Sequence, residues 1–315
     1  MTAPARKSEN HAPRGLRLRP TLRRMHPLRA GVHAARQAKH AAFVAGKRTS
    51  WKLDEARWAL ITTAARTQAP RRPYAFDPAR YRRSFVVRPS PDVTPGEVPR
   101  RVFTIWAGDN ELTPNRRRSL EAMRETIGVP VVLITPDTML DWVVDGHPLH
   151  PALEHLSLVH RSDYLRAYLL HHHGGGYLDL KTPTVSWNPA FERFAADPSA
   201  WIASYPEARA QDPARLPGQL GRDIALNFPR LAGSGAILAR PHSPFTAEWL
   251  RELHRRLDYL APQLAEFPGG VRGEVVGYPV SWTDLMGKIY HPLQLKHLAH
   301  IRQDASLLPQ LTDYQ

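Results

Sequence analysis

The chain has 315 residues, no cysteine and a formal net charge of +14. The lack of cysteine excludes a disulfide framework, a thiolate nucleophile and a cysteine-ligated zinc site. No apolar run reaches the roughly 18 residues of a membrane-spanning helix. The N-terminus also lacks the apolar segment of a secretory signal, so we expect a cytoplasmic protein.

The positive charge is concentrated at the N-terminus. Residues 1–50 contain twelve Lys and Arg side chains against one acid, Glu9, so this segment holds +11 and the rest of the chain +3. Three interpretations stay open: a solvated arm without a dedicated partner, an arm that binds nucleic acid nonspecifically, and an arm that binds anionic lipid. Lipid contact contributes about 1 kcal/mol per basic residue near the surface. We favour the membrane over nucleic acid as a partner.

In chain order, residues 1 to about 28 are polar, basic and interrupted by proline, which is typical of disorder. Residues 31–47 are rich in alanine, and residues 51–66 predict a helix with one apolar face. Residues 70–99 hold seven prolines and predict a linker that crosses the domain surface. The chain is therefore divided into a basic tail, a helix with a proline-rich linker, and one large domain: residues 1–50, 51–99 and 100–315.

In the large domain, predicted strands alternate with predicted helices. We expect strands at residues 101–106, 129–135, 177–180 and 201–205, and within residues 231–239 a Gly233-Ser234-Gly235 turn followed by a strand. We expect helices at residues 114–126, from 136 onward, at 162–173, 243–257 and 281–290. This alternation predicts an α/β fold with a largely parallel central sheet and helices on both faces.

Polar side chains are concentrated in the middle of this domain. Ser162 and Asp163 suit a helix start, where backbone N–H groups are unpaired, and Gly174 suits its end. Arg166 lies three residues after Asp163 and therefore on the same helix face. Asp179 ends a short apolar strand, at the sheet edge where open α/β sheets bind ligands. The segment predicts a polar site rather than a core.

These residues resemble a motif of the nucleotide-sugar glycosyltransferases with the GT-A fold. The motif is Ser-Asp-x-x-Arg, then six or seven mostly apolar residues, then two glycines and a short strand that ends in Asp. Here Ser162, Gly175 and Tyr177 complete it, and a second shared block ends at Trp106. The chain is most similar to the capsular polysaccharide synthesis proteins and to the DXD sugar-binding family of mannosyltransferase-like enzymes and large clostridial toxins. The similarity covers about residues 98–194.

The resemblance implies a GT-A-like, Rossmann-like domain that moves a sugar from a nucleotide diphosphate to a glycan acceptor. It implies a UDP-sugar donor, retention of anomeric configuration, and a setting in capsule or surface polysaccharide synthesis at the inner face of the plasma membrane. A second hypothesis is a pseudo-glycosyltransferase that binds nucleotide or glycan with little turnover. A third is a nucleic-acid-binding protein that uses the basic tail.

The resemblance also implies roles for individual residues. Trp106 would stack on the base, Asp163 and Arg166 would contact the ribose and donor sugar, and Asp179 would contact the ribose or the metal–diphosphate. Each has a structural alternative: a core Trp, a helix-start Asp with an ion pair, and a turn-initiating Asp. The complete set of expected donor-binding residues, besides those with catalytic roles, is Trp106, Ser162, Gly174, Gly175, Tyr177, Lys181, Asn227, Ser281 and Trp282.

The chain departs from the family pattern at Lys181. The related enzymes carry Asp-x-Asp, and the second Asp binds a metal ion, whereas here the triplet is Asp179-Leu180-Lys181. A divalent cofactor, Mn²⁺ or Mg²⁺, would then depend on Asp179 and on substrate phosphates. The Lys181 ammonium would alternatively neutralise the phosphates as a point charge.

Three consecutive histidines, His171 to His173, invite a metal-site interpretation. Successive helical residues point about 100° apart, so three in a row do not face one ion. Histidines in a last helical turn also suit the helix dipole. We therefore do not expect a metal site at these histidines.

Overall fold

The computed structural model describes residues 27–311, and between residues 27 and 48 it describes only the side chains of Lys39 and Lys47. Most of residues 1–28, for which the sequence predicts disorder, lie outside this range. Most of the tail side chains that would contact a partner also lie outside the described residues. The chain divides into a unit up to Asp54 and a unit from Glu55 onward. None of the helices in the described part combines the length and apolar character needed to cross a membrane.

Helix α1 (Pro27–Gln68) is a single helix where the sequence predicts an alanine-rich segment followed by a separate helix. The proline-rich residues after it are irregular, as expected, apart from two short 3₁₀ turns at Pro78–Tyr81 and Phe85–Val87. Tyr81 and Val86 of these turns are buried in an apolar cluster with residues of the large domain. The linker is therefore packed onto the domain as part of it.

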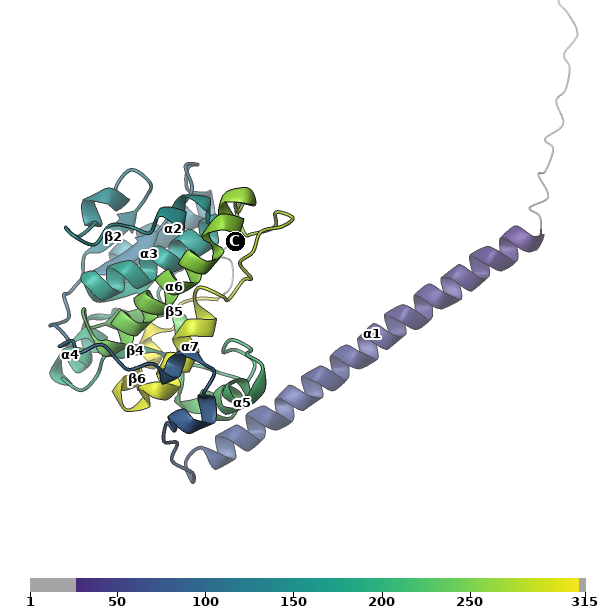
Figure 1. Ribbon diagram of the computed structural model, residues 1–315, viewed down its shortest axis with the longest axis horizontal. Helices are drawn as coiled ribbons and strands as arrows, with labels where there is room; N and C mark the ends of the chain where they lie inside the picture. The colour runs from purple at the N-terminus through teal and green to yellow at the C-terminus, as the bar shows by residue number, and fades with distance from the viewer. Residues whose placement is uncertain (1–26, 312–315) are drawn as a thin grey trace, which may run out of the picture. The chain divides into compact units, whose positions relative to one another are not determined.

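The large domain is an α/β fold (Figure 1). Its mixed, mostly parallel sheet has six strands in the order β2-β1-β3-β5-β4-β6. The strands are β1 (Val102–Ile105), β2 (Val131–Ile134), β3 (Gly175–Leu178), β4 (Ile202–Pro206), β5 (Ala232–Ala239) and β6 (Ile301–Gln303). Strand β5 runs antiparallel to both of its neighbours, and the other three strand pairs are parallel. The predicted fold class is thus confirmed at the level of an α/β domain.

Helices cover both faces of the sheet. They are α2 (Pro114–Thr126), α3 (Leu158–His172), α4 (Asn188–Ala196), α5 (Gly218–Asn227), α6 (Pro244–Glu266) and α7 (Gly287–Lys296). Strand side chains alternate between the faces. Phe103 and Tyr177 pack with α3, α6 and α7 in one apolar core, whereas Val102 and Leu178 pack with α2 and α4 in a second. The domain therefore has three layers.

Local sequence signals predict several elements well. The Thr113 side chain caps α2 by accepting a hydrogen bond from the N–H of Arg116, and Pro114 takes the first helical position. The strands expected at residues 101–106, 129–135 and 201–205 lie within about two residues of β1, β2 and β4.

The predicted start of the central helix is wrong by one turn. Helix α3 begins at Leu158, and its cap is Ser157, whose side chain accepts from the N–H of His160. Ser162 lies inside the helix, where its hydroxyl donates to the carbonyl of Leu158 at 3.1 Å. Capping therefore no longer explains Asp163, which is a buried carboxyl group in a helix interior.

Other boundaries also differ from the prediction. The helix expected from residue 136 is only a 3₁₀ turn, Met139–Trp142, and the helix expected at 281–290 begins later, at Gly287. Helix α6 continues past its expected end through Pro262. The glycines near residue 233 lie inside β5 rather than in a turn before it. Helices α4 and α5 and strand β6 are not among the elements predicted from the sequence.

Gly174 ends α3 in a left-handed conformation with φ +62°, and a Cβ there would lie 2.9 Å from the backbone nitrogen of Pro241. We expect Gly174→Ala to lower the free energy of unfolding by the about 1–2 kcal/mol of left-handed strain plus about 1–3 kcal/mol of overpacking. Urea unfolding measures the change. The control is Gly146→Ala, at φ +76° with no atom within 4 Å of the added Cβ. Equal losses in the two variants would contradict the overpacking.

Candidate functional site

The candidate site lies where the chain changes direction in the sheet. From β1 the chain passes to β2 on one side and then returns to β3 on the other side of β1. Open α/β sheets bind ligands at such a switch point, beyond the carboxyl ends of the strands. Phe103 pairs with Tyr177, so β1 and β3 end side by side. The next residues, Trp106 and Asp179, therefore lie at this edge, as the sequence predicts.

The Asp179 carboxylate is held by three side chains. One oxygen, Oδ1, accepts a hydrogen bond from the Tyr177 hydroxyl at 2.9 Å and lies 3.2 Å from Nη2 of Arg166. The other oxygen, Oδ2, accepts from the Lys181 ammonium at 3.0 Å. Burial acts to raise the pKa of Asp179, but Arg166, Lys181 and these hydrogen bonds hold it below its usual value. Asp179 is therefore a fixed anion between two cations.

Arg166 connects the helix to the strand. Its guanidinium lies 4.2 Å from the centre of the Tyr177 ring, and Nη1 donates to the carbonyl of Ser234 on β5 at 2.8 Å. Nη2 also lies 3.3 Å from Oδ1 of Asp163, and both side chains of this pair are 8% exposed. The Arg166 Nε is buried without a hydrogen-bond partner among the described residues. A ligand oxygen that accepts from this N–H would complete the guanidinium's hydrogen bonding.

Asp163 differs from Asp179 in its protonation. Burial raises the pKa of Asp163 to about 7; Arg166 opposes this change and the negative charge of Asp179 adds to it. The Arg166 guanidinium lowers the pKa of both carboxyl groups, but burial outweighs it at Asp163, whereas Arg166 and Lys181 together outweigh burial at Asp179. At neutral pH the cluster thus contains one permanent carboxylate and one carboxyl group that exchanges a proton.

Strand β5 closes the site with small residues. The N–H of Asp179 donates to the carbonyl of Gly235 at 2.9 Å, and a Cβ at Gly235 would lie 3.1 Å from Oδ2 of Asp179. A Cβ at Gly233 would overlap the ring of Tyr205 at 2.1 Å. The Tyr205 hydroxyl in turn accepts from the N–H of Gly235 at 3.3 Å. These glycines leave room for the carboxylate and for Tyr205, which the sequence did not identify as a site residue.

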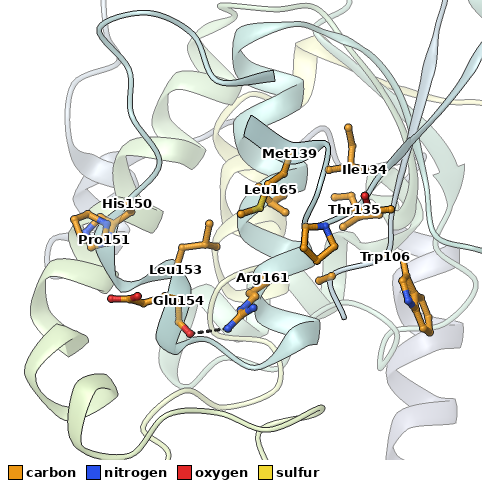
Figure 2. A pocket seen from close by; sticks show the side chains of 13 residues that line it. Trp106, Ile134, Thr135, Met139, His150, Pro151, Leu153, Glu154, Arg161 and Leu165 are labelled. Carbon is orange, nitrogen blue, oxygen red and sulfur yellow. Dashed lines mark hydrogen bonds between the residues drawn. The ribbon is translucent and has the colours of Figure 1, made fainter. Parts of the chain in front are cut away.

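An apolar cavity of about 370 Å³ lies between Trp106 and α3 (Figure 2). Its walls include Ile134, Met139 and Leu165, and Trp106 and His150 lie at opposite ends of the lining. The Trp106 indole N–H donates to the carbonyl of Asn110 at 2.6 Å, which fixes the ring. The volume falls within the about 300–1,000 Å³ of small-ligand pockets. Trp106 is thus a partly exposed wall of a cavity as well as a contact of the core.

Two predicted donor-binding glycines lie away from the Asp179 cluster. Gly174 precedes β3 and Gly175 is its first residue, whereas Asp179 follows the strand, so Gly175 and Asp179 are about 13 Å apart at about 3.3 Å per residue. A Cβ at Gly175 would lie 2.9 Å from the carbonyl oxygen of Arg101. The structure accounts for both glycines by helix termination and close packing.

The remaining predicted residues also have local partners. Asn227 ends α5, where its amide donates to the carbonyl of Asp223 and accepts from Arg230. The N–H of Ser281 donates to Oδ2 of Asp284, and Trp282 is 59% exposed. The segment that leads to Ser281 lies against the start of α3, because the Tyr278 hydroxyl hydrogen-bonds with the N–H of Ser157.

A divalent cation does not fit the cluster as it stands. Hard cations require several oxygen ligands, but both Asp179 oxygens are engaged by protein donors and Asp163 is paired with Arg166. The Lys181 ammonium occupies the place next to Oδ2 where a metal ion would bind. The side chains present favour a cationic site built from Arg166 and Lys181.

No family model, curated protein or solved structure matches the chain. The functional argument therefore depends on the geometry of this site and on the motif that it contains.

We expect Asp163→Asn to change how stability depends on pH. A carboxyl group with a raised folded-state pKa releases its proton more easily when unfolded, so wild-type stability falls as pH rises from about 4 to about 7. The variant lacks this contribution. Urea unfolding across this range should therefore show the wild type losing stability relative to Asp163→Asn as pH rises.

The matched control is Asp137→Asn, an exposed aspartate outside the cluster. Its stability should follow that of the wild type at every pH. A constant difference between the wild type and Asp163→Asn from pH 4 to 7 would show that the pKa of Asp163 is not raised.

Proposed function

We propose that the chain is a GT-A-like glycosyltransferase that moves a sugar from a nucleotide diphosphate, with a UDP-sugar as the expected donor, to a glycan acceptor. The observation that carries the proposal is that Trp106 and Asp179 directly follow the neighbouring strands β1 and β3 at the switch point, where Asp179 is in one charged cluster with Arg166 and Asp163. A nucleotide sugar requires a flat apolar surface for its base next to charged groups for its ribose and diphosphate. This edge of the sheet offers both.

The base would bind in the cavity against the Trp106 indole. The cavity's volume of about 370 Å³ and its apolar lining suit a planar ring. Stacking of a base on an aromatic side chain contributes about 1–3 kcal/mol to binding. Leu165 lines the cavity on the same helix as Asp163 and Arg166. A nucleotide bound in the cavity would therefore extend its ribose and phosphates toward the charged cluster.

The charged groups would act by electrostatic stabilisation of the departing diphosphate. Arg166 and Lys181 are held by Asp179 before any substrate binds, and preorganised charges require little rearrangement during reaction. Asp179 offers its carboxylate oxygens to ribose or sugar hydroxyl groups. Asp163, with its pKa near 7, can donate or accept a hydrogen bond with the same substrate.

A catalytically weak nucleotide-binding protein is the second candidate. It is favoured by one observation: protein side chains already engage both oxygens of Asp179. Such a protein would bind UDP as an active transferase does but would release no UDP from a UDP-sugar. A thermal-shift screen of nucleotide sugars, followed by a UDP-release assay on those that bind, separates the two candidates.

We expect Asp179→Asn to abolish sugar transfer and UDP release and leave the protein folded. The amide keeps the shape of the carboxylate but removes the charge that holds Arg166 and Lys181. Circular dichroism checks the fold, and Asp92→Asn, at an exposed aspartate of the proline-rich segment, is the control. Wild-type turnover in a folded Asp179→Asn protein would exclude this residue from the active site.

We expect Trp106→Ala to weaken UDP binding by about 1–3 kcal/mol, because the variant removes the surface on which the base stacks. Isothermal titration calorimetry with UDP measures the loss. Tyr259→Ala removes a highly exposed aromatic side chain on α6 and should bind UDP as the wild type does. If a folded Trp106→Ala protein kept the wild-type affinity, Trp106 would be only a packing residue.

A further inference from the structure

A second group of polar side chains lies at the other end of α3. His171 and His172 are in the last turn of this helix, and His242 lies between β5 and α6. Gly175 pairs with Ala239 across the antiparallel strands β3 and β5, so the turns at these strand ends are neighbours. One ring nitrogen from each of the three histidines lies within 4.8 Å of the others.

The backbone and its neighbours hold these rings in place. His242 is the one non-glycine residue with positive φ in the described part of the chain, at +54°, and its N–H donates to the carbonyl of His171 at 2.8 Å. Such strained conformations are concentrated at binding sites. The Nδ1 atom of His171 lies 3.1 Å from the Thr246 hydroxyl. This contact leaves the other ring nitrogen, Nε2, available.

His172 supplies a polar atom with no partner. Its Nδ1 is buried and makes no hydrogen bond among the described residues, although buried polar groups are rarely left unpaired. The ring of His147 lies 4.8 Å from that of His172, centre to centre, so a fourth imidazole borders the group. His173, by contrast, hydrogen-bonds through Nε2 to the carbonyl of Trp142. As the sequence indicates, the three consecutive histidines do not converge on one point. The group of three consists of His171, His172 and His242, and His173 lies outside it.

We propose that His171, His172 and His242 bind a divalent transition-metal ion of the zinc type. Imidazole nitrogen is a ligand for Zn²⁺, Ni²⁺ and Cu²⁺, whereas Mg²⁺ and Ca²⁺ require oxygen. In tetrahedral coordination at about 2.0–2.1 Å, ligand nitrogens lie about 3.4 Å apart, so the rings need to approach one another by at most about 1.4 Å. His147 or a water molecule fills the fourth position.

The site joins two parts of the fold that already meet through packing, the His242–His171 backbone hydrogen bond and the contact of His171 with Thr246. A metal ion there links the end of α3 to the turn between β5 and α6. A cavity lined by His147, Tyr168 and the two α3 histidines adjoins the site and gives an ion access. Because β3 separates the histidines from Asp179, this metal site is independent of the proposed donor site. Its role is structural.

The test is a Zn²⁺ titration of the untagged, full-length protein against a chromophoric chelator, with a thermal-shift measurement and the visible spectrum of the Co²⁺ form. His242→Asn removes the ring but keeps a residue that tolerates positive φ. His172→Gln removes a second ligand and does not depend on that backbone. His155→Gln is the control, since His155 is a partly exposed histidine beside Glu154.

The wild type and His155→Gln should bind one Zn²⁺ tightly, show a tetrahedral Co²⁺ spectrum and gain thermal stability with Zn²⁺. Loss of outer-shell partners alone weakens metal sites about 10- to 100-fold, so both ligand variants should lose at least about tenfold in affinity and lose the stabilisation. No Zn²⁺ binding by the wild type, or unchanged affinity in either folded ligand variant, would overturn the proposal. The histidines of the N-terminal tail are present in every variant, so they do not contribute to the difference in Zn²⁺ affinity between the variants.

Discussion

The ion pairs that Arg166 makes with two carboxyl groups organise the candidate site. Arg166 contacts Asp163 on its own helix and Asp179 at the end of β3, while its guanidinium lies on the Tyr177 ring. Removing one partner from a buried ion pair typically lowers the free energy of unfolding by about 3–5 kcal/mol, because an uncompensated charge is left in the interior. The network therefore fixes the position of α3 relative to the sheet edge and, with it, the cavity wall formed by Leu165.

The fold explains why this network forms at this place. Strands β1 and β3 end next to each other at the switch point, and antiparallel β5 brings Ser234 and Gly235 to the same edge. A larger residue at Gly235 would contact the Asp179 carboxylate. The same antiparallel pairing brings the far ends of β3 and β5 together, where the three histidines meet. One strand arrangement thus produces two chemically different clusters of side chains at opposite ends of β3 and β5.

The sequence predicts those features that depend on neighbouring residues. Thr113 with Pro114 marks the start of α2, and Gly174 marks the end of α3. Ser162 misled the prediction because two serines in one segment offer similar capping chemistry, and packing selects Ser157. The sequence places Lys181 two residues after Asp179, and their ion pair forms in the bend that follows β3. The roles of Tyr205 and His242, by contrast, depend on contacts with residues more than twenty positions away. Such contacts leave no periodic signal in a single sequence.

The central claim is that Arg166 and Lys181 bind the diphosphate in place of a metal ion. The most direct measurement compares the affinities of UDP and uridine by calorimetry in EDTA, for the wild type and for Lys181→Met. A charge-assisted contact contributes about 1.5–3 kcal/mol, so the account predicts that the wild type binds UDP at least about tenfold more tightly than uridine. In Lys181→Met this preference should shrink markedly. Equal affinities for UDP and uridine in EDTA, with a preference for UDP that returns only when Mn²⁺ is added, would contradict the account.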